Sequence, residues 1–171
     1  MHRAFEWLPI ASLVGGAVLV LHGGIGDGAW GLRELRGLSR PLSNEFGTDV
    51  HRCVLQALWS DPTESDASME RGVHPNPARG HYLIPKFGHD VTAAFCAREG
   101  VELVVRSHQF VREGVKFMHN GRLVCVFSAR NYFDREQNDS ALLLVAPDEA
   151  DALRVHTKRL AHRVGPCQRC D

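Results

Sequence analysis

Two histidines stand where apolar, strand-like segments end. His22 follows the run Leu-Val-Leu at positions 19–21, and His108 follows Val-Val-Arg-Ser at positions 104–107. A histidine at the end of a buried strand is held by the sheet while its imidazole, a common metal ligand, reaches into a cleft. The glycines after His22 allow another stretch of backbone to approach closely. Either motif alone is more typical of a strand that ends in a tight turn, so the case for a metal site depends on the motifs that accompany the pair.

Further short motifs follow His22 in a fixed order along the chain. Two of them contain charged side chains in segments rich in proline, and one contains a tyrosine after an apolar run. They are Trp-Ser-Asp-Pro at 59–62, Pro-Asn-Pro-Ala-Arg-Gly at 75–80, Phe-Gly at 87–88, Arg-Ser-His at 106–108 and Phe-Ser-Ala-Arg-Asn-Tyr at 127–132.

Taken together, these motifs resemble the phosphoprotein phosphatases, the family of metal-dependent protein serine/threonine phosphatases, over about residues 5–145. The resemblance implies a metallophosphatase-type (calcineurin-like) four-layer α/β sandwich, of which this chain holds only the C-terminal half. It also implies hydrolysis of phosphoserine and phosphothreonine in protein substrates, and association with regulatory subunits. In such enzymes two divalent metal ions, here manganese, iron or zinc, activate a water molecule and neutralise the phosphoryl oxygens.

The resemblance also assigns roles to individual residues. It makes His22 and His108 ligands of the same metal ion, and it makes Arg79 the group that grips the substrate phosphate, for which a planar bidentate donor is well suited. Tyr132 corresponds to a tyrosine that lines the active site. The segment that contains Trp59 and Asp61 corresponds to one side of the substrate groove.

Arg106 is adjacent to the second histidine motif, and an ion-pair role in the structure is open for it.

The motifs of the family's first half are missing from this sequence. The Asp-x-His pair, the aspartate that bridges both metals and the Asn-His pair that supplies the general acid are not found. Two neutral histidines do not hold a two-metal site without the bridging carboxylate. We therefore expect at most one partial metal site and no activity of this chain alone. The alternative is a non-catalytic phosphatase-like module that binds a phosphorylated partner through Arg79.

Length and composition are those of one globular domain. The chain has 171 residues, of which 44% are hydrophobic, and a formal net charge of zero. The balanced charge argues against nucleic acid and membrane surfaces as partners. Five scattered cysteines do not form a disulfide framework, and the apolar segment 8–21 is too short and too interrupted to be a membrane span or a secretory signal. These features favour a cytoplasmic or nuclear protein.

The elements that must position these residues alternate between strands and helices. Apolar runs bounded by turn residues predict strands at 17–21, 101–105, 115–118, 123–127 and 141–145, with a hairpin turn at Asn120-Gly121. Periodic segments predict helices at 31–37, 50–59 and 90–98. The segment 60–80 is rich in Asp, Ser, Pro and Gly and is predicted to be a loop.

We place the phosphatase-like domain at residues 1–147 and a basic tail, outside the core, at residues 148–171. The tail contains Cys167 and Cys170 in a Cys-x-x-Cys pair, with His156 and His162 upstream. Such a set could bind zinc, but a single pair is weak support for it. A basic tail without metal is the other interpretation.

Overall fold

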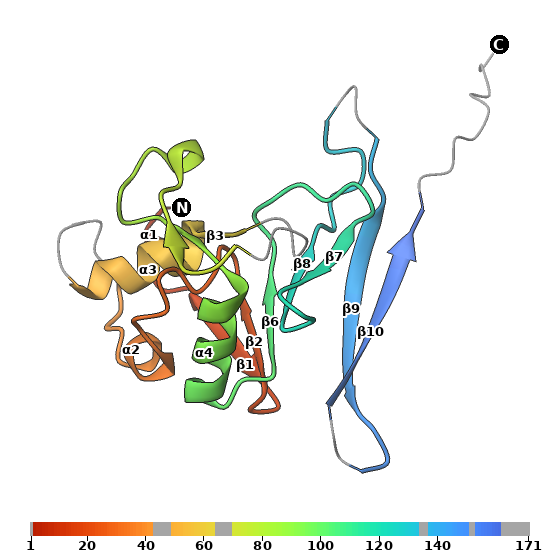
Figure 1. Ribbon diagram of the computed structural model, residues 1–171, viewed down its shortest axis with the longest axis horizontal. Coiled ribbons are helices and arrows are strands. Elements are labelled where there is room, and N and C mark those ends of the chain that lie inside the picture. The colour runs from red at the N-terminus through yellow and green to blue at the C-terminus, as the bar shows by residue number, and fades with distance from the viewer. Residues whose placement is uncertain (1, 43–48, 64–69, 134–136, 151–152, 162–171) are drawn as a thin grey trace. The chain divides into compact units, whose positions relative to one another are not determined.

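The computed structural model describes residues 2–42, 49–63, 70–133, 137–150 and 153–161 (Figure 1). The chain divides into two compact units, residues 1–109 with 117–125 and residues 110–116 with 126–171. The helices are α1 (His2–Phe5), α2 (Leu32–Arg36), α3 (Asp49–Trp59) and α4 (His89–Glu99), with the 3-10 helix η1 (Pro77–Arg79). The strands are β1 (Ala11–Val14), β2 (Val18–Leu21), β3 (Asp61–Pro62), β4 (Val73–His74), β5 (Lys86–Phe87), β6 (Leu103–Arg106), β7 (Val115–Met118), β8 (Leu123–Val126), β9 (Ser140–Pro147) and β10 (Leu153–Leu160).

Parallel strands form the centre of the largest sheet, whose order is β1-β2-β6-β8-β7. Strand β6 lies between β2 and β8 and is parallel to both, with Val20 opposite Val105 (Figure 1). Most of their side chains are buried, including Leu19, Val104 and Leu123. Continuous apolar runs are typical of strands that are covered on both faces. The predicted strand positions are confirmed to within two residues.

The predicted helices are also confirmed, with small shifts at their ends. Helix α4 extends one residue beyond the predicted 90–98 at each end, and Gly100 terminates it in the left-handed conformation with φ of 68°. Glycine adopts this conformation without a steric penalty, which explains its place there. Helix α2 is one residue shorter at each end than predicted, and α3 begins one residue earlier.

The segment predicted as one long loop contains regular structure. Strands β3 and β5 are parallel, and β4 pairs antiparallel with β5 in a three-stranded sheet. Each of these strands has only two residues, too few to leave a periodic hydrophobic pattern in the sequence. This small sheet carries Asp61 at its first position.

The second unit contains an antiparallel ribbon of β9 and β10, in which Ser140 pairs with Leu160 and Pro147 with Leu153. The basic tail predicted after residue 147 therefore includes a strand. In β10, half-buried Leu153 and Val155 alternate with exposed Arg154 and His156. This alternation was not recognised in the sequence because basic residues dominate the segment. Residues 162–171, with Cys167 and Cys170, lie outside the described residues, so the zinc hypothesis stays a prediction.

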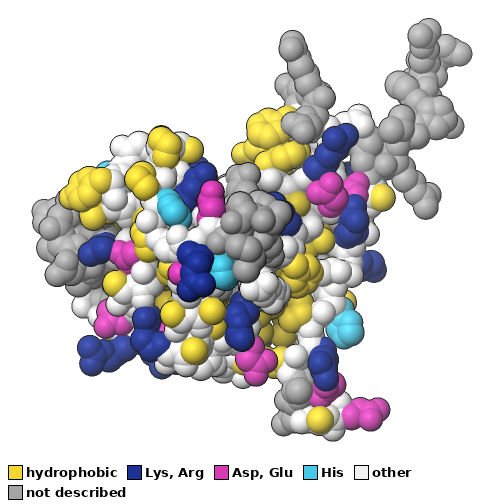
Figure 2. Space-filling model, viewed as in Figure 1, with side chains coloured by type: hydrophobic (Ala, Val, Ile, Leu, Met, Phe, Trp, Pro, Cys, Tyr) yellow, Lys and Arg dark blue, Asp and Glu magenta, His cyan; other side chains and the backbone are white. Residues whose placement is uncertain are grey.

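The charge on the surface agrees with the balanced composition. On the face seen in Figure 2, Lys and Arg side chains are interspersed with Asp and Glu side chains. None of the helices formed by the described residues has the length and apolar character needed to cross a bilayer.

Candidate metal and phosphate site

His22 directly follows β2, where the chain turns against the end of α3. The N–H of Gly23 donates a 2.7 Å hydrogen bond to the carbonyl of Ala57. A Cβ atom on Gly23 would lie 2.4 Å from the backbone nitrogen of Trp59, so only glycine fits. This confirms that the glycine after His22 permits close approach of another backbone segment.

His108 lies two residues beyond β6, the strand next to β2. The N–H of Ser107 donates to the carbonyl of His22 at 3.1 Å, which joins the two strand ends. His108 has a φ of 61°, in the left-handed region that residues other than glycine rarely adopt. In this position its Nδ1 atom lies 3.0 Å from Nε2 of His22. The parallel pairing of β2 with β6 therefore brings together the two histidines that were predicted to be metal ligands.

The surroundings of both imidazoles favour their neutral form. Burial, and then the charges of Arg106 and Arg79, lower the pKa of His22 below its ordinary value. Burial, and then the Arg79 charge, lower the pKa of His108 to about 4, although Asp61 acts in the opposite direction. Both shifts favour the uncharged imidazole, whose nitrogen has the lone pair that a metal ion requires.

The geometry of the histidine pair fits two ligands of one ion. Two nitrogens that each bind a metal at about 2.1 Å, about 90–110° apart, lie about 3.0–3.4 Å from each other. The observed distance is 3.0 Å. Within the described residues, no group of three or more His, Cys, Asp and Glu side chains could hold a metal ion. The pair is therefore arranged as two ligands of one ion would be, its ligand role stays a prediction, and among the described residues no further His, Cys, Asp or Glu side chain joins it to make a group of three.

Asp61 lies below the surface and is the centre of a cluster of donors. Its side chain is 3% exposed. It accepts hydrogen bonds from Nε and Nη2 of Arg79 at 2.7 and 3.0 Å, from Nη2 of Arg106 at 2.9 Å and from Nδ2 of Asn76 at 2.9 Å. Burial alone would raise the pKa of Asp61, but the hydrogen bonds from Arg79 and Asn76 and the two guanidinium charges hold it below the ordinary value. Asp61 is thus a buried anion that orients two arginines.

Arg79 ends the 3-10 helix η1, and Gly80 follows it with a φ of 63°. Two of its three guanidinium nitrogens bind Asp61, which fixes the plane of the group. The described residues offer no partner to the third nitrogen, Nη1, and the side chain keeps 21% of its surface exposed. The charge of Arg79 lowers the pKa of both His22 and His108, so its guanidinium influences the histidine pair electrostatically. A guanidinium held in this way can bind an anion.

Arg106 completes the cluster from β6 and is fully buried. Its Nε donates to the carbonyl of Gly23 at 2.6 Å, and Nη1 donates to Oε1 of Gln109 at 2.7 Å. With the ion pair to Asp61, these bonds tie the loop after β2 to the segment after β6. The ion-pair role left open for Arg106 is confirmed. Asn76 was not predicted to belong to this cluster, because its only signal in the sequence is its place in the Pro-Asn-Pro segment.

Trp59, at the end of α3, stands at the side of the histidine pair. Its ring meets the His108 ring edge to face, with centroids 5.2 Å apart and an interplanar angle of 89°. The side chain is 45% exposed. The structure thus brings Trp59, Asp61 and Arg79 into the same unit as the two histidines, although their predicted roles toward a substrate stay predictions.

Tyr132 belongs to the second unit. Its N–H donates to Oδ1 of Asn138 at 2.9 Å, and its ring packs edge to face on Phe127 and Phe133 at 5.1 and 5.0 Å. The residue is 60% exposed. Its assignment to the active site stays a prediction.

Comparisons with known proteins identify the family of this chain. Residues 2–112 match the family described as calcineurin-like phosphoesterase. The chain is 37% identical over 148 residues to the serine/threonine-protein phosphatase BSL2 of Arabidopsis thaliana, covering 86% of this chain and 14% of that protein. It is 38% identical over 147 residues to the serine/threonine-protein phosphatase T of Aspergillus oryzae, covering 85% of this chain and 29% of that protein.

A solved structure has a similar fold. It is a protein serine/threonine phosphatase of Saccharomyces cerevisiae with similarity to human phosphatase PP5, with a TM-score of 0.76 and 27% identity over 96% of this chain and 50% of that chain. The chain spans less than half the length of the curated relatives it matches, with shares of 14%, 29% and 43% for three of them.

Proposed function

This chain belongs to the calcineurin-like phosphoesterase family, and on that premise we propose that it carries one half of a protein serine/threonine phosphatase site. The observation that supports this most directly is the 3.0 Å approach of His22 to His108. Arg79, whose guanidinium charge lowers the pKa of both histidines, is the group that we propose binds the phosphate. The proposed substrates are proteins phosphorylated on serine or threonine, and the proposed metal is manganese, iron or zinc.

In this proposal each side chain has a limited task. His22 and His108 hold one metal ion through neutral nitrogens, and Arg79 binds phosphoryl oxygens with the part of its guanidinium that Asp61 leaves free. Asp61 and Arg106 position Arg79 and the loop after β2. The bound metals would supply Lewis acidity and a nucleophilic hydroxide near neutral pH. Trp59 forms one wall of the substrate groove, and Tyr132 lines the site.

The chain alone is proposed to be incompetent for turnover. Hydrolysis of a phosphomonoester is extremely slow without catalysis, so a site must both activate water and neutralise charge. The described residues provide two metal-binding nitrogens and no third ligand. In contrast, both oxygens of Asp61 accept hydrogen bonds from Arg79, Arg106 or Asn76, so the arginine cluster is held in place by the described residues themselves. This contrast favours a second candidate function, a non-catalytic module that binds a phosphorylated partner through Arg79 without hydrolysing it.

Manganese binding tests the histidine pair. We expect Mn²⁺ to broaden the imidazole NMR signals of His22 and His108 at lower concentrations than those of the other eight of the ten histidines. Because the pKa of His108 is lowered to about 4, its ring is neutral at pH 6, and we expect the broadening of its own signal to persist there. His108→Ala is expected to weaken Mn²⁺ binding at least about tenfold. Mn²⁺ is a better probe than Zn²⁺ for this experiment, because the cysteine thiolates of the chain compete for zinc.

The exposed His81, which stacks on Tyr82, provides the matched control. His81→Ala is expected to leave Mn²⁺ binding unchanged. Equal broadening of all histidines, or no effect of His108→Ala, would contradict the proposed metal site.

Turnover separates the two candidate functions of the chain. With Mn²⁺ and either p-nitrophenyl phosphate or a phosphothreonine peptide, we expect no more phosphate release than from His108→Ala. Phosphopeptide binding that is lost in Arg79→Gln, in the absence of turnover, would favour the non-catalytic module. Turnover that disappears in His108→Ala would overturn the proposal that the chain is incompetent alone.

A further inference from the structure

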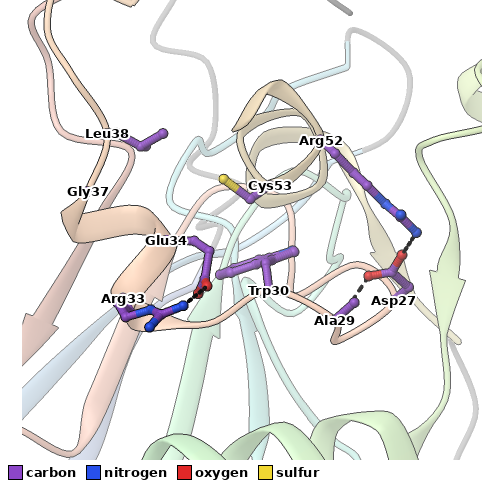
Figure 3. Close-up of a pocket in the computed structure, with 9 residues that line it drawn as sticks. All are labelled: Asp27, Ala29, Trp30, Arg33, Glu34, Gly37, Leu38, Arg52 and Cys53. Atoms are coloured by element: carbon purple, nitrogen blue, oxygen red, sulfur yellow. Dashed lines mark hydrogen bonds and ion pairs between the residues drawn. The ribbon is translucent and has the colours of Figure 1, made fainter. Parts of the chain in front are cut away.

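A cavity of about 690 Å³ lies in the first unit, away from the histidine pair. It is bounded by α2, by α3 and by the turn before α2 (Figure 3). Trp30, Leu38 and Cys53 provide its apolar surface. None of the metal or phosphate residues of the proposed site lines it. Its volume is within the range of about 300–1,000 Å³ that is typical of small-molecule sites.

Two side-chain contacts and one main-chain contact hold Trp30, the central residue of this cavity, in place. Its Nε1–H donates to Oε1 of Gln56 at 3.0 Å, and its ring packs edge to face on Phe95 at 5.4 Å. Its carbonyl accepts a 2.7 Å hydrogen bond from Nη2 of Arg98. A side chain restrained in this way loses little conformational freedom when a ligand binds, so the apolar surface is preorganised.

The two carboxylates at the cavity differ in how many donors they bind. Asp27 accepts from the N–H of Ala29 at 3.0 Å, from Nε2 of Gln56 at 3.2 Å and from Arg52. Glu34 accepts from the N–H of Gly31 at 2.9 Å, at the start of α2. These bonds and the Arg52 charge leave Asp27 with little capacity for a cationic ligand, whereas Glu34, whose side chain is 45% exposed, keeps acceptor positions free beside Arg33.

Arg33, in contrast, has most of its donors available. Its side chain is 94% exposed, and among the described residues its guanidinium has a single pairing, at 3.6 Å to Oε1 of Glu34. That distance is longer than an ordinary hydrogen bond. Figure 3 shows the Arg33–Glu34 pair on the α2 side and the Arg52–Asp27 pair on the α3 side, with Trp30 between them. The cavity thus combines an apolar surface with an available cation.

We propose that this cavity binds a small aromatic carboxylate, whose ring system lies against Trp30 and Leu38 and whose carboxylate accepts hydrogen bonds from Arg33. A guanidinium and a carboxylate match in shape and charge and form bidentate bonds. This site is independent of the proposed phosphatase chemistry, so its failure would leave that proposal unaffected.

The test compares three ligands that share one ring system: 2-naphthoate, neutral 2-naphthamide and cationic 2-naphthylmethylammonium. Each is titrated into the full chain, and binding is followed by the indole N–H NMR signal of Trp30, assigned with Trp30→Phe. We expect naphthoate to bind about tenfold or more tightly than the amide, because it gains a charge-assisted hydrogen bond. The cation should bind most weakly. The signals of Trp7 and Trp59 serve as internal references.

Three variants test the assignment to Arg33. Arg33→Gln should reduce the preference for naphthoate over the amide to about twofold or less, because only the charged donor is removed. Arg36→Gln, on the same helix but outside this cavity, should leave the preference unchanged. Leu38→Trp should fill the cavity and so weaken the binding of both naphthoate and the amide. Equal affinity for all three ligands, no shift of the Trp30 signal, or an unchanged preference in Arg33→Gln would overturn the proposal.

Discussion

Replacing Asp61 with asparagine is expected to lower the free energy of unfolding by about 3–5 kcal/mol, because it leaves a buried charge without its partner. Arg106 is 1% exposed, and Asp61 is its only carboxylate partner among the described residues. The neutral amide keeps the shape of the side chain but loses the charge that balances two guanidiniums. Urea denaturation followed by circular dichroism would measure the change.

An exposed ion pair provides the control for this variant. Arg159 pairs with Asp139 at 2.8 Å, and its side chain is 49% exposed. Arg159→Gln is expected to cost about 1 kcal/mol or less, because solvent screens surface pairs. If Asp61→Asn were as mild as Arg159→Gln, the cluster around Asp61 would not be the buried anion site described above.

The contribution of Asp61 should also depend on pH. Its pKa is lower in the folded protein than the ordinary value of an aspartate. The folded state therefore binds fewer protons than the unfolded state as pH falls through the acid range, which destabilises it. The stabilisation is fully present above the unfolded pKa, about 4, and is lost as pH falls through the folded pKa. The stability difference between the wild type and Asp61→Asn should be constant from pH 7 to 5 and shrink below pH 4.

Replacing Gly23 with alanine is expected to have the second large effect. The new Cβ would lie 2.4 Å from the nitrogen of Trp59 and 2.5 Å from the carbonyl carbon of Leu58, both backbone atoms that cannot rotate away. The end of α3 or the turn after His22 must move, at a cost of about 1–3 kcal/mol or more. Because His22 precedes this glycine, Mn²⁺ binding should weaken as well. Urea denaturation and Mn²⁺ broadening would measure the two effects.

Gly37→Ala is the matched control for Gly23→Ala. Gly37 has a φ of −79°, which any residue adopts, and its added Cβ would meet the nearest atom at 3.4 Å. We expect a change within about 1 kcal/mol and normal Mn²⁺ binding. Normal metal binding in Gly23→Ala would show that the close contact with α3 does not position His22.

The sequence predicted the histidine pair of the candidate site better than the cluster around Asp61. His22 and His108 were found because each ends an apolar run, and runs of that kind predict buried strands directly. The cluster around Asp61 was not predicted as a unit. Its members come from positions 61, 76, 79 and 106, and a contact between distant charged residues leaves no periodic pattern. The left-handed backbone of His108 was equally invisible in the sequence.

By itself, the sequence determined the family, most of the strands and helices, and the position of the two histidines at strand ends, because hydrophobic periodicity and short motifs are local properties of the chain. Only the tertiary structure decided that β2 and β6 are parallel neighbours, which places the imidazole nitrogens 3.0 Å apart. It also decided that Asp61 is a buried anion between two arginines and not simply a residue of an exposed loop. Distances and burial depend on which segments pack together, and that depends on the whole chain.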